Sequence, residues 1–164
     1  MATLTTIEKQ VINDGQKYLE ENNLLKFWQH VKLHYNGIVD CGHIADVFLE
    51  AGINPTQGLK TIYSGLFKYS EAEEIEVAEG VEEIAMFAFD DCPNLYKVTL
   101  PSTLKTIGKW AFYGCPYLTE IYLPEGITEI GKEAFTDLNL IPYAKEGAYA
   151  YEWCKEHYII VNTY

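Results

Sequence analysis

The stretch VTLPSTLKTIGKWAFYGCPYLTEIYLPEGITEIGKEAF, which runs from Val98 to Phe135, decides the fold because it contains one pattern twice. Each copy has a strand-like segment ending in Leu-Pro, followed by an aliphatic residue, Ile-Gly and Ala-Phe. Two further copies of the isoleucine and phenylalanine pair precede this stretch, and the four pairs are Ile62/Phe67, Ile84/Phe89, Ile107/Phe112 and Ile130/Phe135. Successive isoleucines are 22, 23 and 23 residues apart, and such a period predicts a stack of structural repeats.

Other aliphatic columns repeat with the same period. An aliphatic residue stands three positions before each isoleucine, at Leu59, Val81, Leu104 and Ile127. A strand-like pattern recurs between the motifs, with Leu95, Val98 and Leu100 matching Leu118, Ile121 and Leu123, and a weaker copy at Ala72, Ile75 and Val77. Each unit therefore predicts a strand, a turn, a second short extended piece and a helix or turn around the phenylalanine. One unit cannot bury its aliphatic residues alone, so stacking must build the core.

The regions on either side of the repeats have different patterns. Apolar residues from Thr5 to Tyr35 fall mostly at helical spacing, with Glu8 placed to complete a capping box and with weak points at Gly15 and Asn22-Asn23. A second helix is expected after Asp40 and is expected to end at Gly52. Residues 143–164 predict a helix followed by a strand at 158–161. We therefore divide the chain into a helical N-terminal region at 1–57, a solenoid at 58–141 and a C-terminal cap at 142–164.

The repeat units resemble the BspA-type leucine-rich repeat, and the resemblance covers residues from about 59 to 164. It rests on the Val98–Phe135 stretch and on KEGAYAYEWCKEHYIIV at Lys145–Val161, which looks like the closing segment of such proteins. The resemblance implies a short leucine-rich-repeat solenoid, here of about four units of 23 residues, with a helix-strand C-terminal cap. Together with the helical N-terminal cap that the apolar spacing predicts, this gives an α+β fold class. Members of the family are commonly surface proteins of adhesion and recognition. The N-terminal half shows no resemblance to a known family.

The charge balance limits the kinds of partner. The chain of 164 residues has 24 acidic and 12 basic residues, for a formal net charge of −12, and every basic residue is lysine. Arginine is the usual residue for bidentate phosphate contacts, so we expect no direct nucleic-acid binding and no membrane binding. The absence of a long apolar run and of a secretory signal predicts a cytoplasmic location, of the host cell if the protein is phage-encoded. The expected partner is a protein with a basic surface, for example a nucleic-acid-binding protein.

An acidic run is the sharpest functional feature. Its members lie between Tyr69 and Tyr96 with no basic residue among them, and they are Glu71, Glu73, Glu74, Glu76, Glu79, Glu82, Glu83, Asp90 and Asp91. Strand alternation should turn Glu74 and Glu76 outward, together with their repeat counterparts Lys97, Thr99, Glu120 and Tyr122. We take all of these residues as the candidate partner-binding site. The alternative is a solvated face whose carboxylates only keep the protein soluble.

Three histidines and one cysteine form a second constellation, at His30, His34, Cys41 and His43. Histidine and cysteine are zinc ligands, and the first two histidines are one helical turn apart, but the paired C-x-x-C spacing is missing. The alternative is ordinary packing between two helices. Cys92 and Cys115 occupy equivalent repeat positions and are expected to be small buried residues in one column.

The sequence favours a non-enzymatic macromolecule-binding protein without a cofactor. No Walker A, GxGxxG, HExxH or GxSxG string occurs, and no catalytic residue is assigned. The leading hypothesis is an acidic inhibitor or decoy that binds a basic protein surface, such as a phage anti-defence protein of the anti-CRISPR kind. The alternatives are a bacterial surface adhesion and recognition module and a small zinc-binding protein. A homodimer through an open solenoid end or a tyrosine-rich face is also considered.

Overall fold

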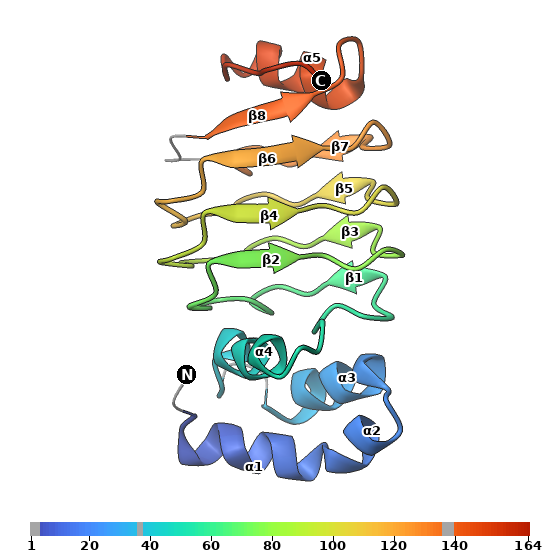
Figure 1. Cartoon of the computed structure of the whole chain (residues 1–164), viewed down its shortest axis with the longest axis vertical. Coiled ribbons are helices and arrows are strands. Elements are labelled where there is room, and N and C mark those ends of the chain that lie inside the picture. The colour runs from blue at the N-terminus through green and yellow to red at the C-terminus, as the bar shows by residue number, and fades with distance from the viewer. Residues whose placement is uncertain (1–3, 36–37, 136–139) are drawn as a thin grey trace.

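The computed structural model describes residues 4–35, 38–135 and 140–164, and it consists of a helical cap, a solenoid and a closing helix (Figure 1). The cap contains α1 (Thr6–Asp14), α2 (Gln16–Glu20), α3 (Leu24–Tyr35) and α4 (Cys41–Glu50). The solenoid follows, and α5 (Tyr149–Glu156) lies at its far end. None of the helices in the described ranges is long and apolar enough to cross a membrane.

The solenoid is built from two parallel four-stranded sheets. One sheet has the order β1 (Thr61–Ile62), β3 (Glu83–Ile84), β5 (Thr106–Ile107) and β7 (Glu129–Ile130). The other has the order β2 (Glu74–Glu76), β4 (Lys97–Thr99), β6 (Glu120–Leu123) and β8 (Ile141–Ala144). Thr61 pairs with Glu83, Glu83 with Thr106 and Thr106 with Glu129, at offsets of 22, 23 and 23 residues. The predicted period and the predicted stacking are therefore confirmed.

The core consists of identical positions stacked from one turn to the next. The four phenylalanine rings form a ladder in which Phe67, Phe89, Phe112 and Phe135 have centroid separations of 4.8, 4.9 and 5.7 Å. Trp153 of α5 closes this ladder with an edge contact to Phe135 at 6.1 Å. The Sγ atoms of Cys92 and Cys115 point to carbonyl oxygens of Phe67 and Phe89 at 3.1 and 3.0 Å. Both cysteines are fully buried free thiols, as the repeat position predicts.

The cap forms as its sequence predicts, and it is bonded to the first repeat. Thr5 and Glu8 make the capping box of α1, and the first helical stretch ends at Gly15 and again at Asn22 and Asn23. Gly52, with φ of 73°, follows α4, and the N–H of Ile53 donates to the carbonyl of Phe48 at 2.8 Å.

Asp46 of α4 joins the cap to the solenoid. Its buried carboxylate accepts hydrogen bonds from the hydroxyl of Ser70 and from the backbone N–H of Glu71. Trp28 of α3 contributes a second bond between elements, because its Nε1 donates to the carbonyl of Pro55 at 2.8 Å. Burial raises the pKa of Asp46 more than these hydrogen bonds lower it.

The C-terminal cap differs from the sequence prediction at its strand. The helix is confirmed as α5, but residues 158–161 form no strand, because Tyr158 adopts a left-handed φ of 59°. The neighbouring Asn162 instead makes an isolated parallel bridge with Tyr143. Tyr143 belongs to β8, a strand that the sequence analysis did not predict, and β8 extends the β2, β4, β6 sheet by one more turn.

Candidate functional site

The outer surface of the β2, β4, β6, β8 sheet gathers the outward-facing strand positions of the solenoid, and we call it the outer face. Its members are Glu74, Glu76, Lys97, Thr99, Glu120, Tyr122, Ile141 and Tyr143. Glu74 pairs in register with Lys97, which pairs with Glu120, so these three residues form one column across the sheet. Ile75 and Val98 point inward and are 2% exposed, which confirms the predicted alternation.

The acidic run does not form one surface, because its residues wind around a whole turn of the solenoid. Glu71, Glu73 and Glu79 flank β2 at the margins of the outer face, and they are exposed. Glu82 and Glu83 instead belong to the turn before β3 and to β3 itself, in the other sheet. Asp90 and Asp91 lie in the following turn. The structure therefore assembles only part of the predicted site.

Asp90 was predicted as a partner-binding residue, but it is not accessible to a partner. Its side chain is buried, with 6% of the residue exposed, and its carboxylate pairs with the ammonium of Lys68. A buried carboxylate requires such a partner, because leaving its charge unpaired would cost several kcal/mol, on the order of 3–5. The sequence run contains no lysine, but the stacking of turns brings one from 22 residues away.

Lysines of neighbouring turns neutralise other members of the run as well. Glu74 pairs with Lys97 at 3.0 Å and accepts a hydrogen bond from the hydroxyl of Tyr96. The tyrosine and lysine bonds lower the pKa of Glu74, while the bond to Glu74 raises the pKa of Tyr96. Glu82 pairs in the same way with Lys60 of the preceding turn.

Several exposed carboxylates on or beside the outer face have no lysine partner. Within the part of the chain that the structure describes, no ion pair is made by Glu71, Glu73, Glu76, Glu79 or Glu120, and the first four of these lie on β2 or next to it. Negative charge is therefore concentrated at the end of the outer face nearest the helical cap. This end is the part of the predicted acidic site that can attract a basic partner.

Tyrosine rings cover the other end of the outer face. Tyr122 and Tyr143 stack with a centroid separation of 4.6 Å and an interplanar angle of 16°. Tyr164 lies beside Tyr122 at 6.0 Å, and its hydroxyl donates to the carbonyl of Leu123 at 2.9 Å. Of these three rings, only Tyr122 belongs to the site predicted from the sequence. Tyr143 could have been found from the alternating pattern of Leu140 to Ala144, in which it takes an outward position. Nothing in the sequence indicates that Tyr164 lies on the outer face.

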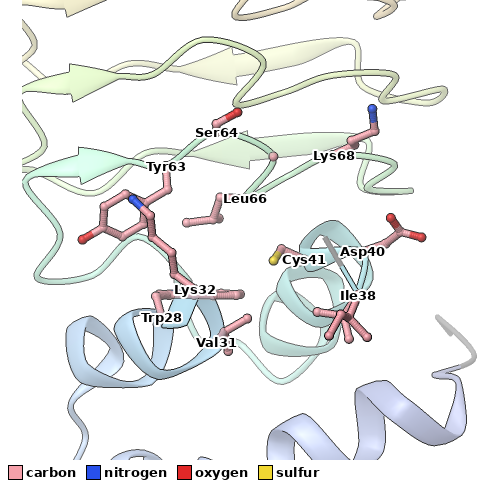
Figure 2. Close-up of a pocket in the computed structure, with 12 residues that line it drawn as sticks. Trp28, Val31, Lys32, Ile38, Asp40, Cys41, Tyr63, Ser64, Leu66 and Lys68 are labelled. Carbon is pink, nitrogen blue, oxygen red and sulfur yellow. The ribbon is translucent and has the colours of Figure 1, made fainter. Parts of the chain in front are cut away.

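A separate pocket of about 710 Å³ lies between the helical cap and the first repeat (Figure 2). Leu66 points from the repeat toward the space between α3 and α4, where the Cys41 thiol lies. Lys32 extends from α3 to the ring of Tyr63, with its Nζ 4.6 Å from the centroid. Asp40 stands on another side, so the pocket combines apolar walls with charges of both signs.

Cys41 in this pocket is not an activated nucleophile. Burial, followed by the nearby charges of Asp40 and Glu8, raises the pKa of the thiol to about 11. A nucleophilic cysteine needs a lowered pKa, because the thiolate is the reactive form. The thiol is therefore protonated near neutral pH, and the pocket offers space for an apolar group.

The predicted zinc ligands do not converge. Within residues 4–35, 38–135 and 140–164, no group of three or more His, Cys, Asp or Glu side chains is placed to hold a metal ion. The rings of His30 and His34 lie 4.7 Å apart, whereas His43 contacts the buried Glu8 at 3.2 Å. Burial and the neighbouring His34 lower the pKa of His30. Helix packing therefore accounts for these residues better than zinc coordination does.

Known proteins share the repeated part of the chain. Residues 51–145, more than half of the 164, match the family described as "BspA type Leucine rich repeat region (6 copies)". A solved leucine-rich repeat protein from Bacteroides ovatus ATCC 8483 is similar, with 30% sequence identity and a TM-score of 0.37. That alignment covers 50% of this chain and 28% of the other, well under two thirds of its length. No curated protein matches the chain at a significant level.

Proposed function

Because the chain belongs to the BspA-type leucine-rich repeat family, we propose that it is a non-enzymatic protein that binds a basic protein surface through its outer face. The repeats of such proteins are typically binding modules, and a protein-binding role follows from the fold. The observation that carries the choice of surface is the placement of Glu73 and Glu76, two exposed carboxylates without a lysine, at one end of a face whose other end carries exposed tyrosine rings.

Rigid presentation supports this choice. Each outward side chain stands on a strand that is hydrogen-bonded to one or both neighbouring strands, so little backbone conformational entropy is lost on binding. Tyrosine provides a large contact area with few rotatable bonds, and Tyr96 and Tyr122 are 41% and 49% exposed. Acidic groups steer a basic partner toward this surface and determine how the complex responds to salt.

The finer form of the proposal is an inhibitor. A surface with negative charge at one end and aromatic rings at the other suits a decoy that occupies the basic groove of a nucleic-acid-binding protein. A phage-encoded blocker of a nucleic-acid-guided nuclease would need such a surface, and it would act in the cytoplasm. A surface adhesion module would use the same face on a partner outside the cell, so cell fractionation separates the two.

The test uses two matched pairs of charge-neutralising substitutions. E73Q/E76Q removes two of the unpaired carboxylates at β2, on the outer side of its sheet. E83Q/E129Q removes the same number of charges from β3 and β7 of the other sheet. All four side chains are exposed, so every variant should fold, and far-UV circular dichroism checks this.

Affinity capture from lysate of the source cells, followed by mass spectrometry, identifies the retained proteins. The purified partner is then titrated against each variant. We expect E73Q/E76Q to weaken binding about two- to thirty-fold, and E83Q/E129Q to leave it unchanged. Equal affinities for the two variants, or a retained partner with an acidic surface, would contradict the proposal.

A further inference from the structure

A second pocket, of about 550 Å³, opens at the tyrosine end of the outer face, where the strands of that sheet lead into their turns. Its walls include the rings of Tyr122 and Tyr164 and the apolar surfaces of Leu100 and Pro124. The carboxylates of Glu79 and Glu125 complete the lining, together with Ser102 and Gly126. We call this space the tyrosine pocket.

The two rings form a corner with fixed geometry. Their centroids are 6.0 Å apart and their planes meet at 57°, so the faces are not stacked against each other. Tyr143 stacks on Tyr122 with a centroid separation of 4.6 Å, and the hydrogen bond from the Tyr164 hydroxyl to the carbonyl of Leu123 holds the second ring in place. Tyr122 is 49% and Tyr164 56% exposed, which leaves ring surface available to a ligand.

Two carboxylates line the pocket, and within the described ranges one of them has no lysine partner. Glu79 is fixed by two hydrogen bonds from Ser102, one from its backbone N–H at 2.9 Å and one from its hydroxyl at 3.1 Å. Glu79 makes no ion pair among the residues that the structure describes, whereas Glu125 pairs with Lys145 at 2.9 Å. No lysine lines the described part of the pocket.

We infer that the tyrosine pocket binds an alkyl cation, namely the ammonium or guanidinium group of a lysine or arginine side chain on the partner. A cation is attracted by the faces of tyrosine rings, and this attraction grows where water is excluded. The carboxylate of Glu79 adds a direct counter-charge, and the aliphatic stem of the side chain fits the apolar wall of Leu100 and Pro124. The inference rests on the proposed function, because it names the group through which the basic partner is anchored.

The test uses small probes in place of the partner. n-Butylguanidinium and n-butylammonium carry the cation, and n-butylurea is a neutral mimic of the guanidinium shape. Each probe is titrated into isotope-labelled protein, and the tyrosine ring signals are followed by nuclear magnetic resonance. Both cations should shift the signals of Tyr122 and Tyr164, and the cation with the lower dissociation constant identifies the preferred side chain.

Three variants define the site. Tyr164→Ala should weaken cation binding about three- to ten-fold, and Glu79→Gln about two- to five-fold. Tyr117→Ala is the matched control, because this tyrosine is 63% exposed and precedes β6, at the end of the strand opposite to the pocket. Its affinity for the cations should equal that of the unchanged protein.

Equal shifts from n-butylurea, equal shifts at Tyr117, or an unchanged affinity in Tyr164→Ala would overturn the inference. These outcomes are separate from the test of the proposed function. If the cations do not bind while E73Q/E76Q still weakens the partner, the pocket is not an anchor and the outer face keeps its role. If the cations bind and E73Q/E76Q has no effect, the acidic end is not used and the pocket inference stands.

Discussion

Removing the ring of Phe112 should be among the most damaging single changes in the solenoid. Phe112 is fully buried and lies between two other rings, with centroids at 4.9 Å to Phe89 and 5.7 Å to Phe135. Phe→Ala changes in cores cost about 3–5 kcal/mol, and each lost aromatic pair adds about 0.5–1.5 kcal/mol. Because these costs overlap, we expect Phe112→Ala to lower the free energy of unfolding by about 4–5 kcal/mol.

Urea unfolding followed by circular dichroism measures this loss. With a urea dependence of about 2 kcal/mol per molar, the midpoint should fall by about 2 M, and the melting temperature by roughly 8–20 °C. Tyr113→Ala is the control, because Tyr113 is the next aromatic residue and is 41% exposed. Its cost should stay within about 0.5 kcal/mol. A loss below about 1.5 kcal/mol in Phe112→Ala, or equal losses in both variants, would refute the stacked-ring core.

Three further changes test other parts of the structure. Gly131→Ala should lower the free energy of unfolding in urea by about 2–3 kcal/mol, because a Cβ there would lie 2.3 Å from the backbone nitrogen of Lys109. Gly126→Ala is the control and should lower it less, because its Cβ would lie nearest to the flexible side chain of Lys105. Equal losses in the two variants would contradict this. Alkylation of Cys41 at about pH 8 should be roughly a hundred-fold slower than that of an ordinary thiol, because burial raises its pKa to about 11, and a normal labelling rate would contradict this. Burial raises the pKa of Asp46 above its ordinary value of 3.8, so the folded state holds its proton more tightly, and stability falls as pH rises above 3.8. The difference in unfolding free energy between the natural protein and Asp46→Asn should therefore become less favourable to Asp46 as pH rises, and the opposite trend would show that the shift is wrong.

Much of the solenoid could be predicted because each column repeats one physical requirement. The isoleucine and phenylalanine positions must be apolar in every turn, so their period marks the stacking directly. The capping box at Thr5 and the left-handed Gly52 are local signals that need no tertiary information. The repeat columns and the two helix ends could therefore be predicted without knowledge of the three-dimensional contacts.

Features that depend on neighbouring turns could not be predicted in the same way. Asp90 appears in the sequence among acidic residues, yet Lys68 lies beside it because the turns stack. Phe87 and Trp110 adopt left-handed φ values of 59° and 54°, which bulky residues rarely do. Hydrogen bonds between turns hold this bend, for example from the N–H of Gly65 to the carbonyl of Phe87 at 3.0 Å.

The candidate site was predicted in part for a related reason. Strand alternation correctly turned Glu74, Glu76 and Tyr122 outward. It could not show that Glu83 lies in the other sheet and Glu82 in the turn before it, because the chain changes sheets within the acidic run. Tyr143 was missed because β8 pairs with β6 at an offset of 21 residues, which breaks the period.

The dissociation constant of the partner complex, measured at about 50 and about 300 mM salt, shows whether unpaired carboxylates on the outer face attract a basic protein surface. We predict that the natural protein loses at least about ten-fold in affinity over this range, and that E73Q/E76Q loses less than E83Q/E129Q does. An affinity that is independent of salt, or the same salt dependence in both variants, would contradict such an attraction.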